Sequence, residues 1–311
     1  LDLTTGERTV VSDSFTGTVS DTAVLFGIQG IGYDAAGNRL LALDSYKKVI
    51  WQIDLATAHR SPLASGAIGT GPGIDFPGRM DVDSEGGVAY YVEQNSNTLI
   101  RLDLSTGDRT VVSGGAVGVG PAFVGVTDVA LDIAGNRAFI SDWTADALFA
   151  VDLATGDRTL VSDAATGTGP IFTVPRSLTY DDANDRVLIA DFDQDALFAV
   201  DITTGNRTVL SDNAGIGQGP NFSVPFDVAV DPGSNRAFVP DYGIDQLLSI
   251  DLTSGDRTNI HPFTDVQQLN LLNPYYMELD VANDRAFIYD VALSGITVVD
   301  LSTGERAVVS K

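Results

Sequence analysis

The chain has 311 residues, 44% of them hydrophobic, which is enough material for one large core or several smaller ones. Forty-two acidic residues against eighteen basic residues give a net charge of −24, so nucleic acid and anionic membranes are disfavoured as partners. There is no cysteine, which excludes disulfides and cysteine-ligated metals. No apolar run reaches the roughly 20 residues of a membrane helix, so we expect no membrane insertion. The acidic composition favours a secreted or periplasmic protein, with adaptation to high salt as the alternative reason for the charge.

A phrase of about a dozen residues opens the chain, as LDLTTGERTVVSD at residues 1–13, and returns throughout it. It reads VDLATGDRTLVSD at residues 151–163 and DLSTGERAVVS at residues 300–310. The aspartate of the phrase recurs every 49 to 52 residues, at Asp2, Asp54, Asp103, Asp152, Asp201, Asp251 and Asp300. A steady period of this length in a strand-rich pattern is typical of propeller blades.

Each period contains four short alternating segments separated by turn residues. In residues 225–261 the segments PFDVAVD, RAFVPD, QLLSIDL and RTNIH predict strands A to D of one blade, and nothing has helical spacing. Six sets of strands A to C begin near Ile28, Gly78, Val126, Pro175, Pro225 and Pro274. The sequence therefore predicts an all-β fold, a six-bladed β-propeller of four-stranded antiparallel blades with about 49 residues per repeat. We expect residues 1–311 to form this single domain.

The first copy of the phrase, residues 1–13, has no strand A, B or C before it. The C-terminus supplies its own strand D at residues 306–310, so the chain holds seven D segments for six blades. We expect residues 1–13 to form an extra outer strand that closes or extends the last blade. The alternative is that the chain is a module cut from a longer exported protein.

Two stretches carry a resemblance to known repeats. DIAGNRAFISDWTADALFAVDLATGDR (132–158) and DDANDRVLIADFDQDALFAVDITTGNR (181–207) resemble the NHL and YWTD propeller repeats. In those families a turn that starts with Asp leads into a strand ending in Asp, and a hydrophobic strand follows. The resemblance implies the fold, and because these families include receptors, scaffolds and enzymes it implies no particular chemistry. The neighbouring gluconolactonase-like propellers use Glu and Asn metal ligands that have no counterpart at Gln29, Arg79 or Arg176.

Most of the fifteen arginines follow the repeat and are predicted to pair with turn aspartates. These twelve are Arg8, Arg39, Arg60, Arg109, Arg137, Arg158, Arg186, Arg207, Arg236, Arg257, Arg285 and Arg306. Of the other three, Arg101 is expected at a surface or blade edge. Arg79 and Arg176 are predicted at equivalent places, where strand A starts beside the channel mouth. There they would bind a ligand carboxylate or phosphate, or else neutralise acids such as Asp75 or Glu93.

Each strand B ends in a carboxylate, and the next residue is aromatic in three consecutive blades. The carboxylates are Asp44, Glu93, Asp142, Asp191, Asp241 and Asp290. They are expected to accept hydrogen bonds from loop N–H groups, with a calcium site as the alternative. The aromatic residues are Trp143, Phe192 and Tyr242, with Tyr46 one position later in blade one. They are candidates to stack on a sugar ring, or else to seal the joint between blades.

The loop HPFTDVQQLNLLNPYY (261–276) breaks the repeat and brings His261, Tyr275 and Tyr276 to the same face. Breaks in a repeat collect where function lies. Tyr275 joins the ligand-binding candidates, and His261 and Tyr276 are the candidate acid–base residues of a catalytic site. No metal site is predicted, and no cofactor beyond calcium as an alternative.

These residues favour a secreted propeller that binds a ligand on the channel-mouth face, with an acidic carbohydrate as the preferred class. Polysaccharide lyase or hydrolase activity is a further expectation for that site. Two alternatives stay open: a non-catalytic protein-interaction scaffold, and a lactonase-type metallohydrolase, which needs at least three convergent oxygen ligands. A small molecule, an oligosaccharide or a protein is the expected partner, and the protein is expected to be a monomer.

Overall fold

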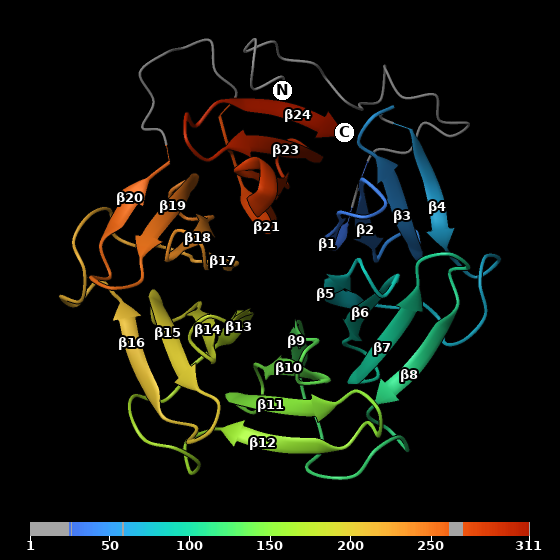
Figure 1. Ribbon diagram of the computed structural model, residues 1–311, viewed down its shortest axis with the longest axis horizontal. Coiled ribbons are helices and arrows are strands. Elements are labelled where there is room, and N and C mark those ends of the chain that lie inside the picture. The colour runs from blue at the N-terminus through green and yellow to red at the C-terminus, as the bar shows by residue number, and fades with distance from the viewer. Residues whose placement is uncertain (1–24, 26, 58, 261–269, 311) are drawn as a thin grey trace.

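The computed structural model describes residues 25, 27–57, 59–260 and 270–310. Within them lie six four-stranded antiparallel sheets arranged as the blades of a ring (Figure 1). This confirms the six-bladed β-propeller expected from the repeat. The predicted extra strand at residues 1–13 lies outside the described residues. Among the residues described, no helix has the length and apolar character that crossing a bilayer requires.

Each blade runs from an inner strand at the axis to an outer strand at the rim. Blades 1 to 3 comprise β1 (Ile28–Asp34), β2 (Arg39–Asp44), β3 (Val49–Asp54) and β4 (Arg60–Ala64); β5 (Pro77–Asp83), β6 (Val88–Glu93), β7 (Thr98–Asp103) and β8 (Arg109–Ser113); and β9 (Val126–Asp132), β10 (Arg137–Asp142), β11 (Ala147–Asp152) and β12 (Arg158–Ser162). Blades 4 to 6 comprise β13 (Pro175–Asp181), β14 (Arg186–Asp191), β15 (Ala196–Asp201) and β16 (Arg207–Ser211); β17 (Ala229–Asp231), β18 (Arg236–Asp241), β19 (Gln246–Asp251) and β20 (Arg257–Asn259); and β21 (Pro274–Asp280), β22 (Arg285–Asp290), β23 (Gly295–Asp300) and β24 (Arg306–Ser310). One 3-10 turn, η1 (Val281–Asn283), joins β21 to β22.

The inner strand of blade 5 is shorter than the sequence pattern predicts. Regular pairing covers Ala229 to Asp231, and an isolated bridge joins Pro225 to Asp241. The other five inner strands also shift register near their first residues, where a β-bulge lies. In blade 5 the ladder is interrupted at Phe226, whose carbonyl accepts a hydrogen bond from Arg79 across the ring.

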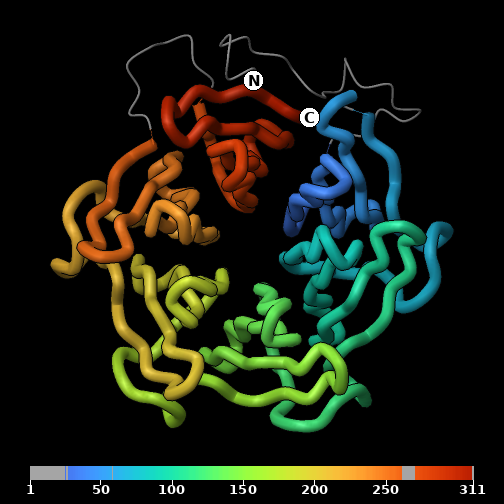
Figure 2. Tube along the Cα trace, in the orientation of Figure 1, coloured from blue at the N-terminus to red at the C-terminus, as the bar shows by residue number. Residues whose placement is uncertain are grey.

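The hydrophobic core is divided into six clusters, one at each seam between adjacent blades. At the seam of blades 1 and 2, for example, Leu41 and Ile50 pack against Met80 and Tyr91. A single sheet cannot cover its own faces, so each blade is stable because it lies between two neighbours. Figure 2 shows the six blades arranged around a common axis, with their inner strands nearest to it.

Blades 1 and 6 meet at the closing seam through side chains. Ile31 of β1 and Tyr289 of β22 belong to one buried cluster. The Tyr33 hydroxyl donates to Asp280 Oδ2 at 3.1 Å, and the Tyr289 hydroxyl donates to the Leu25 carbonyl at 3.3 Å. All four strands of blade 6 come from residues 274–310, so among the described residues these contacts join the two ends of the ring.

The recurring phrase forms a latch between one blade and the next. In blade 4, Arg207 Nε donates to the Pro170 carbonyl and Nη1 donates to Ser162 Oγ, both at 2.6 Å. Pro170 belongs to the Gly-x-Gly-Pro loop that follows the outer strand of blade 3, and Ser162 ends that strand. The same Nε contact with the loop proline is made at 2.6–2.8 Å by Arg109, Arg158 and Arg257. The arginine of one blade and the Gly-x-Gly-Pro loop that precedes that blade therefore together form the contact that we call the latch.

The predicted pairing of the repeat arginines with turn aspartates is right for one set and wrong for another. At the A–B turn, four arginines form ion pairs at 2.7–2.8 Å: Arg39 with Asp34, Arg137 with Asp132, Arg186 with Asp181, and Arg285 with Asp280. Arg236 instead donates to Ser234 Oγ. The four latch arginines bind mainly backbone carbonyls, because the glycines and prolines of the loop leave those carbonyls exposed to a fork of N–H donors.

The latch predicts a large difference between two glycine substitutions. Both Gly205 and Gly87 have positive φ, 71° and 66°. A Cβ at Gly205 would clash with the Val161 carbonyl of the preceding blade, whereas a Cβ at Gly87 meets open space. We expect Gly205→Ala to lower the free energy of unfolding by about 2–4 kcal/mol and Gly87→Ala by about 1 kcal/mol. Urea unfolding of both variants measures this, and equal losses would contradict the latch.

Candidate functional site at the channel mouth

The side chains along the axis come from two positions of each inner strand. Because side chains alternate along a strand, the third and fifth residues point the same way. With blade 5 counted from Pro225, where its isolated bridge lies, the third positions carry Gly30, Arg79, Asp128, Ser177, Asp227 and Tyr276, and the fifth carry Gly32, Asp81, Ala130, Thr179, Ala229 and Glu278. Residues from both rings line a cavity of about 80 Å³. Blades 3 and 5 contribute the same pair, Asp and Ala, whereas the pairs of the other four blades all differ, so the axis keeps less symmetry than the rim.

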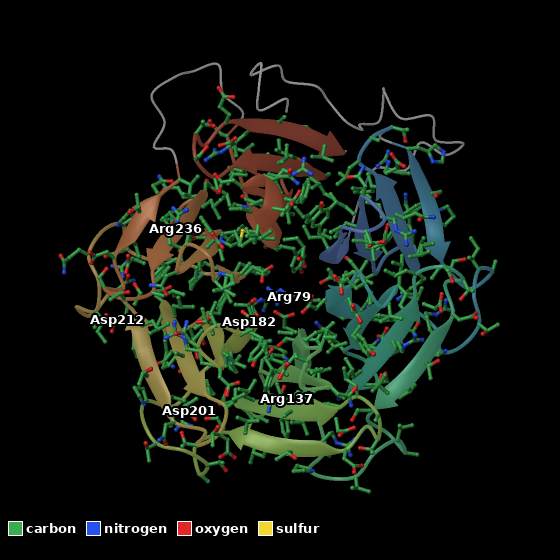
Figure 3. The ribbon with its side chains drawn as sticks, in the orientation of Figure 1. Arg79, Arg137, Asp182, Asp201, Asp212 and Arg236 are labelled. Atoms are coloured by element: carbon green, nitrogen blue, oxygen red, sulfur yellow. The ribbon has the colours of Figure 1, made fainter. Side chains whose placement is uncertain are left out.

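Arg79 reaches across the axis from blade 2, as Figure 3 shows at the centre of the ring. Its Nη1 donates to the Arg176 carbonyl at 2.8 Å, and its Nη2 donates to the Phe226 carbonyl. Its Nε lies 3.6 Å from Asp227 Oδ1 and 3.8 Å from Asp128 Oδ2. The side chain is 6% exposed and ties together blades 2, 3, 4 and 5. The acids near it are therefore not the Asp75 and Glu93 that the sequence suggested.

The two carboxylates beside Arg79 are also bound to the backbone of the next inner strand. Asp128 Oδ2 accepts from the Leu178 N–H at 3.0 Å, and Asp227 Oδ2 accepts from the Met277 N–H at 2.9 Å. Burial raises the pKa of Asp128 to about 7, although the Arg79 guanidinium acts in the opposite direction. Burial also raises the pKa of Glu278 well above its ordinary value, and Asp81 and Asp227 add to the effect. The axis thus holds carboxyl groups that resist ionisation.

Arg176 lies one residue earlier in its strand than Arg79 does in its own, so the two arginines are not equivalent. Arg79 is third in β5 and Arg176 is second in β13. The Arg176 guanidinium lies over the Phe226 ring, 4.3 Å from its centroid, and 5.5 Å from that of Phe192. No salt bridge involves Arg176 in the described part of the chain, and its Nε is buried without a hydrogen bond. Burial and the nearby Arg79 cation lower its pKa.

Aromatic side chains of blades 4, 5 and 6 form a cluster around Arg176. Phe226 stacks on Tyr275 at 4.1 Å between ring centroids, and Phe192 meets Phe226 edge-on at 6.2 Å. Tyr242 meets Tyr275 edge-on at 5.1 Å. We call Phe192, Phe226, Tyr242 and Tyr275 the mouth cluster. Inner strands start and B strands end on this face, which brings together residues that are far apart in the sequence.

The other predicted aromatic residues lie in different settings. Tyr46 and Trp143 are 75% and 48% exposed, so they stand out from the face. Tyr276 is buried, and its hydroxyl donates to Gln29 Oε1 at 3.3 Å. Burial raises the pKa of the Tyr276 phenol. His261, the other candidate acid–base residue, lies outside the described residues.

The carboxylates that end the B strands accept loop N–H groups, as the sequence predicts. Asp241 accepts from Ser223 at 2.9 Å and from Val224 at 3.0 Å, and Glu93 accepts from the Asp75 N–H at 3.0 Å. These bonds hold the loop that precedes each inner strand. Within the described ranges, no three His, Asp or Glu side chains form an arrangement able to hold a metal ion.

The acids on the axis were missed because strand A of blade 2 was expected to begin at Gly78, one residue after its first residue Pro77, which made Arg79 and Arg176 look equivalent. Alignment on the aspartate that ends each strand places Arg79, Asp128 and Asp227 at one position and separates Arg79 from Arg176. Phe226 was missed because it is the second residue of PFDVAVD, which was predicted to be a regular strand A, where an apolar residue is expected. Both signals are present in the sequence.

Comparisons with known proteins support the fold. No protein-family model matches the chain, and no curated protein matches its sequence. A structure from a nidogen/laminin complex superposes with a TM-score of 0.66 at 15% identity, covering 85% of this chain and 91% of that one. A Bacteroides thetaiotaomicron protein of unknown function superposes with a TM-score of 0.70 at 15% identity, covering 93% of this chain and 74% of that one. By fold, the chain resembles the six-bladed propellers with YWTD-type repeats.

Arg79 is predicted to be a large contributor to stability. In Arg79→Met, Asp128 and Asp227 lose the cation between them and two backbone carbonyls lose their donor. We expect the free energy of unfolding to fall by about 3–5 kcal/mol, the usual cost of removing one partner of a buried ion pair. Urea unfolding provides the measurement, and Arg101→Met on β7, for which no ion pair is found among the described residues, is the control. Equal stability of the two variants would show that Arg79 is not a structural tie.

Proposed function

We propose that the protein is a ligand-binding propeller whose channel-mouth face takes an acidic carbohydrate. The observation that carries this proposal is Arg176, a largely covered cation without a carboxylate partner in a chain of net charge −24. The latch arginines also lack carboxylate partners, but their donors bind backbone carbonyls, whereas the Arg176 Nε is buried without a hydrogen bond and is the donor that an anion supplied from outside would satisfy. A guanidinium binds a carboxylate through two parallel N–H donors.

The mouth cluster supports a sugar as the part of the ligand next to the anion. Phe192 and Phe226 lie against Arg176, and Tyr275 and Tyr242 continue the cluster from Phe226. Phe226 is buried, so the partly buried rings of Phe192, Tyr242 and Tyr275 are the ones that would pack against the C–H face of a sugar. A uronic acid combines such a face with a carboxylate. A glycan of this kind fits a secreted or periplasmic protein.

Polysaccharide cleavage is a finer form of the same proposal. A lyase needs a cation beside the uronate carboxylate and a group that moves a proton. Arg176 would meet the first need. Tyr276 is the described candidate for the second: its phenol is protonated at neutral pH and would turn from Gln29 Oε1, to which it donates, to protonate the leaving oxygen, while a separate base takes the proton from the sugar carbon next to the carboxylate. The reaction is tested by following the formation of unsaturated uronate products.

The binding test compares Arg176→Gln with Arg101→Gln, using trigalacturonate and cellotriose as probes. We expect trigalacturonate, and not cellotriose, to raise the melting temperature of the wild-type protein, since a ligand of the native state stabilises it. Arg176→Gln should weaken trigalacturonate binding by about 10- to 100-fold, the worth of a charge-assisted bidentate contact. Arg101→Gln should leave it unchanged. Binding by wild type that survives Arg176→Gln would contradict the proposed site.

A protein partner is the second candidate, favoured by the exposed Tyr46, Val124 and Trp143 side chains on the same face. One of the structures that resemble this chain in fold comes from a nidogen/laminin complex. Failure of every uronate to bind wild type would favour this candidate. A partner that covers the face would bury Trp143, so acrylamide quenching of its fluorescence should fall on binding, and unchanged quenching would place the partner elsewhere.

A further inference from the structure

Arg79 separates two environments along the axis. On one side its Nη atoms bind the backbone carbonyls of Arg176 and Phe226, which carry the guanidinium and the ring at the channel mouth. On the other side its Nε faces Asp128 and Asp227 at the wall of the buried cavity. One side chain therefore contacts both the acids of the axis and the backbone that supports the mouth.

We propose that the carboxyl cluster on the propeller axis is a proton-operated control of the anion site at the channel mouth, acting through Arg79. This inference rests on the proposed anion site at Arg176. Its ligand-free test below is independent of any carbohydrate.

The cavity contains more potential negative charge than its one cation can balance. The groups around Asp128 come from every neighbouring blade: Arg79 and Asp81 from β5, Ser177 and the Leu178 N–H from β13, Asp227 from the segment before β17, and Tyr276 and Glu278 from β21. Blade 1 contributes Gly30 and Gly32, which have no titratable group. Asp128 and Asp227 lie nearest the buried Arg79 guanidinium, and Asp81 and Glu278 line the same cavity. One cation cannot offset the desolvation of all these carboxylates, so a proton taken up at Asp128 relieves part of that cost.

The pKa shifts of three of these carboxyl groups agree with this charge balance. Burial raises the pKa of Asp128 to about 7 and raises that of Asp81, and Glu278 is raised furthest from its ordinary value. Asp128 therefore gains a proton as the pH falls through neutrality.

The mouth responds because Arg176 lies within the field of the same groups. Arg79 lowers the pKa of Arg176 and Asp227 raises it, so the potential at Arg176 depends on how much of the Arg79 charge is neutralised. Protonation of Asp128 leaves Arg79 less neutralised and makes the mouth more positive. An anion at Arg176 should therefore bind more tightly as the pH falls through about 7, and its binding should draw a proton into the cluster.

The experiment follows the Arg176 Nε–H resonance in protein labelled with ¹⁵N-arginine, assigned by its loss in Arg176→Gln, from pH 5.5 to 8.5 without ligand. We expect an inflection near pH 7 that disappears in Asp128→Asn. Asp182→Asn, an exposed acid on the A–B turn of blade 4, is the matched control and should keep it. Trigalacturonate titrations should show affinity about fivefold higher at pH 6 than at pH 8 in wild type. That difference should be absent in Asp128→Asn.

The outcomes distinguish the two proposals. A resonance that does not move with pH overturns the proton control, whether or not the carbohydrate binds. An inflection without trigalacturonate binding supports the control and rejects the acidic carbohydrate. Affinity that is independent of pH in wild type overturns the control even if the resonance moves. If Asp128→Asn unfolds, Glu278→Gln removes an acid of the same cavity and should shift the midpoint of the inflection.

Discussion

A four-stranded blade cannot bury its two faces alone, and this constraint governs the whole molecule. Six clusters of apolar side chains fill the six seams, so every blade depends on both neighbours. The polar latches at the rim fix the angle at which successive blades meet. Because the seams and the latches hold the blades together, the inner strands do not need to pack closely against one another. The axis can therefore contain polar and charged side chains.

Two arginines that look alike in the sequence have different roles because they differ by one residue in register. Arg79 points into the axis, where its hydrogen bonds and ion pairs connect four blades. Arg176 lies on an aromatic ring at the mouth and lacks an ion pair within the described residues. A structural cation and a candidate ligand-binding cation thus lie next to each other, joined by one hydrogen bond from Arg79 to the Arg176 carbonyl.

The fold was predictable because the repeat exposes it many times over. The sequence pattern of each strand and turn occurs six times, so one irregular copy, such as the one that contains β17, does not obscure the repeat. The site was less predictable, because it consists of the residues that do not repeat. Arg176, Phe192, Tyr242 and Tyr275 were found as departures from the repeat, and the structure brings them together. Asp128, Asp227 and Glu278 were not found. The sequence aligns them at shared strand positions, but the contact of Asp128 and Asp227 with Arg79, and the cavity that Glu278 lines with them, become evident in three dimensions.

The latch has a consequence for how such a ring can change over time. Each of blades 2 to 5 presents the same arginine to the loop behind it. The contacts between successive blades are therefore the same at each of these seams. A blade that is duplicated or exchanged within the ring would form the same arginine–loop contacts with its new neighbours. The inner strands share no such repeated contact. Substitutions can therefore accumulate on the inner strands one residue at a time, while the latch contacts of the outer strands keep the blades in the same arrangement.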